Sequence, residues 1–197
     1  MASAITHFVV GAGLALPLTA VGRVTGTLRP AGVVVAAGLL GALPDLDALL
    51  RGMLHPDILH HRGATHAPVV LAAFCLGLAV CLGLLVRRLP PSSVVLLGGT
   101  WALAAISHPL LDAMTNGGPG VLLLYPFSEQ RLFFPWRPLE VAPLSISRFP
   151  RAAARVLSSE LPFALGAVCL GLAGRFLVKV ATRPSKARSA EPGFGLN

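Results

Sequence analysis

Long apolar stretches without charged side chains constrain this chain more than any other feature. They cover residues 1–22, 31–44, 67–86, 89–111 and 161–174, and Arg175 follows the last. A helix of about 20 apolar residues, rising about 1.5 Å per residue, crosses a hydrocarbon core about 30 Å thick. Only 12% of the residues are charged, against about 25% in soluble domains. The sequence therefore predicts an all-α fold, a polytopic transmembrane helical bundle of about five spans.

The residue composition at each end of the chain indicates whether that end belongs to the membrane domain. Residues 1–22 lack the basic start and the A-x-A cleavage site of a signal peptide, so we expect them to remain as the first span. Residues 1–182 then form one membrane-embedded domain. Residues 183–197 are rich in Pro, Gly, Ser, Lys and Arg, which predicts a basic, disordered tail.

The net charge indicates which kinds of molecule the chain binds, and the cysteine count indicates whether disulfides are present. The net charge of +8 comes from 16 Lys and Arg against 8 Asp and Glu. In so apolar a chain it favours membrane lipids as partners, and no nucleic acid is expected. Cys75, Cys81 and Cys169 are odd in number and form no C-x-x-C pair, so we interpret them as small buried apolar residues.

Alternation of five spans sorts the polar residues onto two membrane faces. All six His and all four Asp fall on the face with segments 51–66 and 113–160, or at helix ends beside it. The other face carries a basic set: Arg23, Arg29, Arg87, Arg88, Lys179, Arg183, Lys186 and Arg188. The positive-inside rule makes the basic face cytoplasmic. We therefore predict a multi-pass inner-membrane protein whose His/Asp face is periplasmic or outer.

Two acids follow the second span in the stretch Pro44-Asp45-Leu46-Asp47. Positions i and i+2 do not share a helix face, so in a helix both cannot point at one atom. One acid is then a metal ligand and the other a hydrogen-bond partner of a ligating His. The alternative for this stretch alone is a solvated loop with a helix N-cap.

The next polar stretch is His60-His61-Arg62-Gly63-Ala64-Thr65-His66. Neutral imidazole is the commonest metal ligand, and an Arg fork beside it suits phosphate. Thr65 is a suitable N-cap for the helix that follows. The alternative is an interfacial polar loop.

His108 and Asp112 are four residues apart, so in a helix they lie on one face as a chelating pair. An Asp at the centre of a membrane span costs about 2.5–3.5 kcal/mol and needs a partner. His7, near the start of the first span, is expected at the same depth.

These stretches supply up to seven nitrogen and oxygen ligands: His7, Asp45, Asp47, His61, His66, His108 and Asp112. Seven ligands are enough for two ions bridged by a carboxylate, the usual arrangement for phosphoester hydrolysis. His and Asp without Cys suit Zn²⁺ and are compatible with Mn²⁺ or Fe. We expect one or two divalent ions, with Zn²⁺ the first choice.

These motifs, with Leu124-Tyr125-Pro126-Phe127-Ser128 downstream, resemble the YdjM-like (LexA-regulated type) family of membrane-bound metal-dependent hydrolases over about residues 1–135. That family is similar to zinc-dependent phospholipase C and fungal single-strand nucleases. The resemblance implies that the ligands are His7, Asp45 or Asp47, His61 or His66, His108 and Asp112, with Asp112 as the bridge. Ala67 replaces a common Ser, and the further His and Glu of the soluble phospholipases are missing, so a third ion is not expected.

Two segments of the long connection 115–159 have simpler interpretations. The aromatic residues from Tyr125 to Trp136 indicate an interfacial belt, or alternatively a lid over the metal site, with Glu129 beside it as a weak general-base candidate. Arg148, Arg151 and Arg155 have the spacing of a basic amphipathic helix lying on the membrane.

The leading hypothesis is an integral-membrane hydrolase that activates water at a His/Asp-bound metal centre. Its substrate would be a phosphoester, with a phospholipid as one candidate. Arg62 and Asp47 are the candidate catalytic residues, and Arg62 would neutralise phosphoryl charge. The alternative is a transporter of metal ions or protons, because intramembrane His and Asp also mark ion pathways. A metal-stabilised structural protein is the third hypothesis.

Overall fold

The computed structural model describes residues 1–49, 61–143 and 147–183. Within these ranges every regular element is helical. Two isolated β-bridges, Thr115 with Leu139 and Val121 with Leu132, fix the long connection between the last two helices. The elements are α1 (Ala4–Ala15), η1 (Leu16–Ala20), α2 (Gly22–Thr25), α3 (Pro30–Ala42), η2 (Leu43–Asp45), α4 (Leu46–Leu49), η4 (Ala64–His66), α5 (Pro68–Leu85), α6 (Pro91–Ala113) and α7 (Phe149–Ala181).

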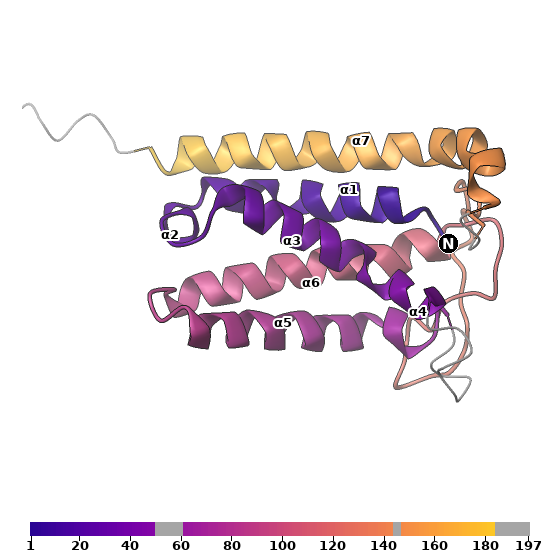
Figure 1. The fold of residues 1–197 in the computed structure, drawn as a ribbon, viewed down its shortest axis with the longest axis horizontal. Helices are drawn as coiled ribbons and strands as arrows, with labels where there is room; N and C mark the ends of the chain where they lie inside the picture. Colours follow the sequence, from indigo (N-terminus) through magenta and orange to yellow (C-terminus); the bar gives the residue numbers. More distant parts are fainter. Residues whose placement is uncertain (50–60, 144–146, 184–197) are drawn as a thin grey trace, which may run out of the picture.

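The prediction of a helical membrane bundle with about five spans is confirmed. Four helical stretches are long and apolar enough to cross a membrane: Pro30–Ala48, Pro68–Leu85, Pro91–Ala113 and Phe149–Ala181. The shorter apolar stretch Ala4–Ala20 runs beside them (Figure 1). Pro30, Pro68 and Pro91 each occupy the first position of a helix, where the missing N–H costs no hydrogen bond.

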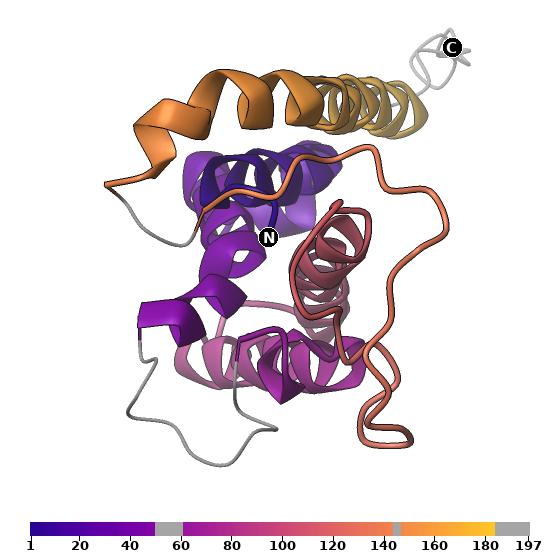
Figure 2. The same cartoon turned by 90° about the vertical axis from the view of Figure 1, so that its right-hand side faces the viewer.

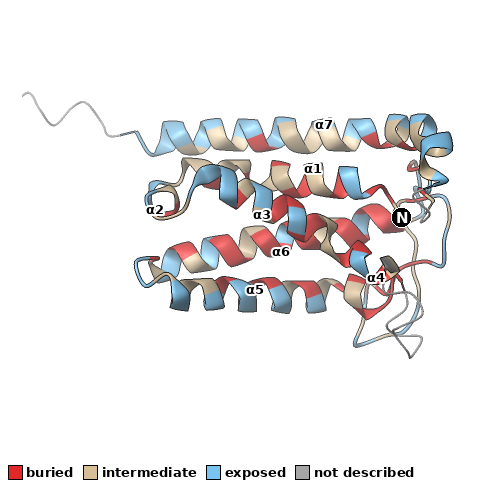
Figure 3. Cartoon of the chain, in the orientation of Figure 1, coloured by how far each residue is buried: buried red, intermediate tan, exposed pale blue. Residues whose placement is uncertain are grey.

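Helix α1 lies at the centre of the packing. It contacts α3, α6 and α7, and α5 joins the bundle by packing against α6. Figure 3 shows exposed and half-buried residues along the outer faces of α5 and α7. Many of these are large and apolar, such as Leu84, Leu170 and Phe176, so these faces suit contact with lipid.

Glycine lets α1 approach its neighbours closely, as small residues do in membrane helix packing. A Cβ on Gly41 of α3 would lie 2.7 Å from the carbonyl oxygen of His7, and one on Gly11 would lie 2.6 Å from that of Ala37. On the other side, a Cβ on Gly171 of α7 would lie 2.1 Å from the carbonyl oxygen of Gly13. Backbone contacts on both sides therefore fix the depth at which α1 sits.

Helix α7 is longer than its charge-free run of residues 161–174. It spans 33 residues, or about 50 Å at 1.5 Å per residue. The helix begins at Phe149, twelve residues before the charge-free run, and continues past Arg175 to Ala181. Figure 2 shows its first turns running across the end of the bundle before the helix follows the others. The basic stretch with Arg151 and Arg155 is therefore the start of the last helix, and Pro162 supplies a break in its hydrogen bonding.

The interpretation of all three cysteines as buried is wrong for two of them. Cys75 is buried, whereas Cys81 and Cys169 are exposed on α5 and α7. An apolar run in a membrane helix does not distinguish a residue facing protein from one facing lipid, because both environments are apolar.

The two ends of the bundle differ as the charge pattern predicts. Asp45, His66 and Asp112 lie at the end where α5 begins and α6 finishes. Arg23 of α2, the Arg87–Arg88 turn and Lys179 near the end of α7 lie at the other end (Figure 1). The predicted disordered tail lies outside the described residues from position 184 onward.

Replacing Gly171 by Ala tests the close contact of α7 with α1. We expect Gly171→Ala to lower the free energy of unfolding by about 1–3 kcal/mol, because the added methyl group meets the backbone of Gly13. Gly166→Ala in the same helix is the matched control, since its Cβ would meet nothing within 4 Å. Thermal unfolding in detergent measures both, and equal melting temperatures for the two variants would contradict the packing argument.

Candidate metal centre

Seven predicted site residues from four parts of the chain meet at one end of the bundle. His7 comes from α1, Asp45 and Asp47 from the η2–α4 turn, and His108 and Asp112 from α6. His61 and His66 belong to the segment leading into α5. All seven are buried. The expected convergence at a single membrane depth is therefore present.

Six of the seven form two groups able to hold a metal ion. The first contains His7, Asp45, His108 and Asp112, and the second contains Asp45, His61, His66 and Asp112. In each group, one ligand atom from every residue lies within 4.8 Å of the others. Because Asp45 and Asp112 belong to both groups, the arrangement is one continuous cluster with two carboxylates at its centre.

Hydrogen bonds on the far side of two imidazoles fix the nitrogens that face the cluster. Nδ1 of His108 lies 2.8 Å from the carbonyl oxygen of Gly41, which can only accept, so Nδ1 donates. Nδ1 of His61 lies 2.7 Å from Oδ1 of Asp47. A neutral imidazole with its proton on Nδ1 has a free lone pair on Nε2, the form that binds a metal.

His66 is held in the same way. The Thr65 hydroxyl donates to Oδ2 of Asp47 at 2.6 Å, so its oxygen accepts from Nδ1 of His66 at 3.1 Å. Burial lowers the pKa of His66 to about 4, against the opposing hydrogen bond to Asp47. Nε2 of His66 then faces Nε2 of His108 at 3.2 Å. Two lone pairs at this distance repel unless a cation lies between them or beside them.

Asp112 is the most connected carboxylate of the cluster. Its Oδ1 accepts from the backbone N–H of Ala2 at 2.7 Å and lies 3.4 Å from Nε2 of His7. Its Oδ2 accepts from Nε of Arg62 at 3.1 Å and lies 3.9 Å from Nε2 of both His66 and His108. The stacked rings of His7 and His108, with centroids 3.6 Å apart, close this side of the cluster.

Unpartnered buried atoms and excess negative charge make the cluster suit a divalent cation. Among the described residues, both ring nitrogens of His7, both carboxylate oxygens of Asp45 and Nε2 of His61 are buried without a hydrogen-bond partner. Each such atom costs about 1–3 kcal/mol if nothing satisfies it. With neutral imidazoles, the carboxylates of Asp45, Asp47 and Asp112 stand against one buried guanidinium among the described residues, that of Arg62. The donor set therefore fits a bound metal ion in both number and charge.

Asp47 differs from Asp45 in its surroundings. Its oxygens bond to His61 and Thr65 and face Nδ1 of His66 at 3.2 Å, and it belongs to neither four-residue group. This agrees with the expectation that one acid of the pair faces the ions while the other supports a His. The prediction that Thr65 is an N-cap is wrong, because Ala67 is the N-cap of α5 and the Thr65 hydroxyl bonds to Asp47.

Arg62 is fully buried behind Asp112. Its Nη1 donates to the carbonyl of Gly117 at 3.0 Å and its Nη2 to the Thr115 hydroxyl at 2.8 Å. Its φ of 63° lies in the left-handed region, which a non-glycine residue adopts at a cost. Most of its donors therefore hold the protein together, and a catalytic role for Arg62 stays a prediction.

Among the described residues, no other sequence candidate joins the two ligand groups. Glu129 is exposed, and His60 lies outside the described residues. Trp136 packs against Phe163 of α7 with ring centroids 6.0 Å apart, which favours the aromatic belt over the lid. Glu160 of α7, which none of the sequence motifs contains, is a further buried carboxylate, and it accepts from the Thr6 hydroxyl at 2.7 Å and from Ser3. Its position directly before the charge-free run of residues 161–174 was the available signal.

The sequence is similar to those of known inner membrane proteins. The model of the YdjM inner membrane protein family matches residues 1–183. The chain belongs to this family. Among YdjM-family relatives, the inner membrane protein YbcI of Escherichia coli (strain K12) is 35% identical over 135 residues, which cover 67% of this chain and 76% of YbcI. No solved structure matches the chain. The predicted inner-membrane location is thus confirmed, and this YdjM-family protein carries a buried His/Asp cluster able to hold a metal.

Metal analysis of detergent-purified protein tests the cluster. We expect one or two divalent ions per chain in the wild type, and binding weakened by more than about 100-fold in Asp45→Asn, which removes a central carboxylate. Asp45 is the sharpest target because its oxygens accept no hydrogen bond within the described chain, and its 3.3 Å contact is with Nε2 of His108, another residue of the same ligand group. Elemental analysis and competition titration with a zinc chelator measure content and affinity.

Two control variants accompany this measurement. Asp47→Asn should keep the number of ions but weaken their affinity by about 10–100-fold, because it disturbs only the supports of His61 and His66. Glu129→Gln removes an exposed acid and should change neither quantity. Wild-type metal content and affinity in Asp45→Asn would contradict the proposed site.

Proposed function

We propose that this protein is an integral-membrane, metal-dependent hydrolase of phosphoesters. The observation that carries the proposal is the pair of four-residue groups joined by Asp45 and Asp112. Two neighbouring cation sites with shared carboxylates are the usual arrangement for displacement at phosphorus. A metal site with a purely structural role would need only one closed set of four ligands.

The residues assigned to the metal are His7, Asp45, His61, His66, His108 and Asp112, with Asp45 and Asp112 as shared ligands. One or two Zn²⁺ ions bound there would polarise the phosphoryl oxygens and lower the pKa of a coordinated water to about 7. The protein holds the imidazoles in the required orientation through Gly41 and Asp47. Asp47 is therefore assigned as a positioning residue rather than a ligand.

Access to the cluster supports an enzyme. His61 lines a cavity of about 450 Å³ at this end of the bundle, so one edge of the cluster is open to a substrate. Arg62 lines the same cavity and brings positive charge beside the cluster. Elsewhere the apolar helices α1, α3 and α6 enclose the site and exclude water.

The distribution of buried polar groups favours hydrolysis over ion transport. Among the described residues, every buried polar or charged side chain except Ser93 lies at the metal end of the bundle. Ser93 bonds to the carbonyl of Arg23 near the opposite end. A transport pathway needs polar groups along its whole length, whereas a hydrolytic site needs them at one depth.

Hydrolysis of a generic phosphodiester tests the proposed activity. We expect zinc-loaded protein in detergent to cleave bis(p-nitrophenyl) phosphate, and Asp45→Asn to lower kcat/KM by at least about 100-fold. Removal of zinc by a chelator should abolish the activity and its return should restore it. Zinc flux into proteoliposomes without hydrolysis would instead establish a transporter. Unfolding on zinc removal, with no activity in the loaded protein, would establish a structural metal.

The orientation of the site is tested separately. We infer that the metal end faces the periplasm, because Arg23, Arg87, Arg88 and Lys179 lie at the opposite end. A cysteine introduced at exposed Glu129 should react with a membrane-impermeant maleimide added to intact spheroplasts, and one introduced at Arg87 should react only after lysis. The reverse pattern of labelling would place the metal centre in the cytoplasm.

A further inference from the structure

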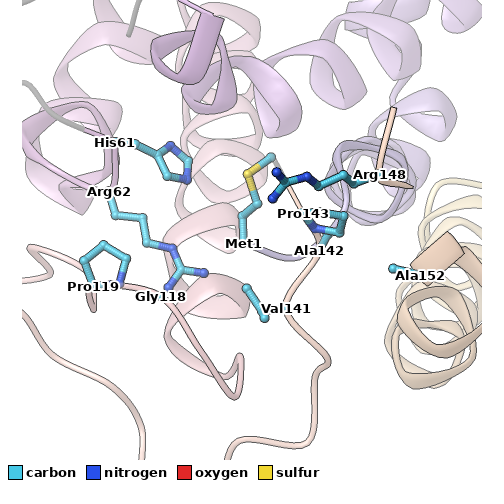
Figure 4. Close-up of a pocket in the computed structure, with 10 residues that line it drawn as sticks. All are labelled: Met1, His61, Arg62, Gly118, Pro119, Val141, Ala142, Pro143, Arg148 and Ala152. Atoms are coloured by element: carbon cyan, nitrogen blue, oxygen red, sulfur yellow. The ribbon is translucent and has the colours of Figure 1, made fainter. Parts of the chain in front are cut away.

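The cavity beside the metal centre has a composition that the cluster itself does not require. It encloses about 450 Å³ and lies between the start of α7, the segment around residue 142 and the segment carrying His61 (Figure 4). Its walls combine His61, Arg62 and Arg148 with the apolar residues Val141, Ala142 and Pro143. Such a mixture suits a ligand with an anionic part and an apolar part.

The inner wall of the cavity is polar and rigid. Nε2 of His61 is buried and has no hydrogen-bond partner among the described residues. Arg62 is fully buried, and its bonds to Asp112, Thr115 and Gly117 use three of the five N–H groups that a guanidinium offers. An anionic group in the cavity would meet the positive charge of Arg62 on this side, while the Nε2 lone pair of His61 stays assigned to the metal.

Arg148 supplies a second positive group at the mouth. It directly precedes α7, and Figure 4 shows its guanidinium directed into the cavity, with the Met1 side chain drawn between it and His61. Its side chain is exposed and has no hydrogen-bond or ion-pair partner within the described chain. Arg151 and Arg155 lie on the same helix and do not line this cavity. Arg148 thus differs from Arg151 and Arg155 because its side chain lines the cavity.

The location of the cavity selects the source of the anion. Its lining residues include Arg148 and Ala152 at the start of α7, whose first turns lie at an angle to the rest of the bundle (Figure 2), and a basic helix start of this kind suits the level of lipid headgroups. Its volume of about 450 Å³ equals that of roughly fifteen water molecules at about 30 Å³ each, so it has room for more than a single phosphate group. The apolar side chains of Val141, Ala142 and Pro143 give no benefit to a free phosphate.

We propose that this cavity binds the phosphate-bearing headgroup of an anionic membrane lipid, and that Arg148 is the residue that determines this specificity. The lipid would enter from the interface, with its phosphate between Arg148 and the side of the cavity formed by His61 and Arg62. The assignment of that lipid as the substrate rests on the proposed function. The binding site itself stands on the cavity and its charges.

Native mass spectrometry of the full chain in detergent tests the site without depending on turnover. The probes are dioleoyl phosphatidylglycerol, dioleoyl phosphatidylcholine and inorganic phosphate. We expect wild-type protein to bind phosphatidylglycerol about tenfold more tightly than phosphatidylcholine, the effect of one charge-assisted hydrogen-bonded contact. Arg148→Gln should lose this preference, and the matched control Arg151→Gln should keep it.

The outcomes separate the binding site from the enzymatic proposal. Equal losses in Arg148→Gln and Arg151→Gln, or an unchanged preference in Arg148→Gln, would overturn the inference. Binding of inorganic phosphate as tight as that of phosphatidylglycerol would also overturn it, because the site would then take a free anion. Arg148-dependent lipid binding without hydrolysis would support the site and overturn the proposed enzyme.

A kinetic measurement links the two when hydrolysis is present. With phosphatidylglycerol in mixed micelles, Arg148→Gln should raise KM about tenfold and leave kcat within about twofold, because Arg148 binds the headgroup away from the ions. With bis(p-nitrophenyl) phosphate, which lacks the glycerol headgroup and the acyl chains, Arg148→Gln should raise KM less than it does with phosphatidylglycerol, and the matched control Arg151→Gln should match the wild type with both substrates. A fall in kcat for both substrates would assign Arg148 a structural role and overturn its part in specificity.

Discussion

The carboxylate of Asp112 is the point on which the arrangement of this protein depends. It bonds to the Ala2 N–H and to Arg62, and it lies within 3.9 Å of ring nitrogens of His7, His66 and His108. A buried carboxylate in a membrane helix raises the free energy of the folded state when it has no partner. Separating Asp112 from its partners would restore that cost, so the contacts stabilise one another. One side chain of α6 thereby brings together the segments around α1 and η4, which have no sequence proximity to it.

The level at which these partners meet is set by backbone packing rather than by the polar groups. Gly11 and Gly41 let α1 and α3 touch, and Gly13 and Gly171 do the same for α1 and α7. The carbonyl of Gly41 also accepts from His108. A shift of one helix along its neighbour would therefore break apolar packing and ligand orientation together, so the apolar part of the bundle and the cluster specify the same register.

The features of the site that depend on residues close together in the sequence could be predicted from it. The four-residue spacing of His108 and Asp112 and the alternation of Asp45 and Asp47 fix relative directions within one turn of chain. Sequence reasoning failed where the deciding contact is distant in the sequence. The bonds of Thr65 to Asp47 and of Glu160 to Ser3 and Thr6 depend on helix packing, as does the exposure of Cys81. The length of α7 was underestimated because charged residues near the interface can continue a helix beyond the hydrocarbon core.

The hydrogen bonds of Glu160 have a consequence for the order in which the protein is built. All six residues of the two ligand groups are translated within the first 112 positions, yet Ser3 and Thr6 are tethered by a carboxylate that emerges 48 residues after the last of them. The earliest helix thus acquires its final anchor only when the latest one inserts. The last helix to be synthesised therefore completes the hydrogen bonds at the start of the first helix, and the polar end of α1 is fixed only after α7 has inserted.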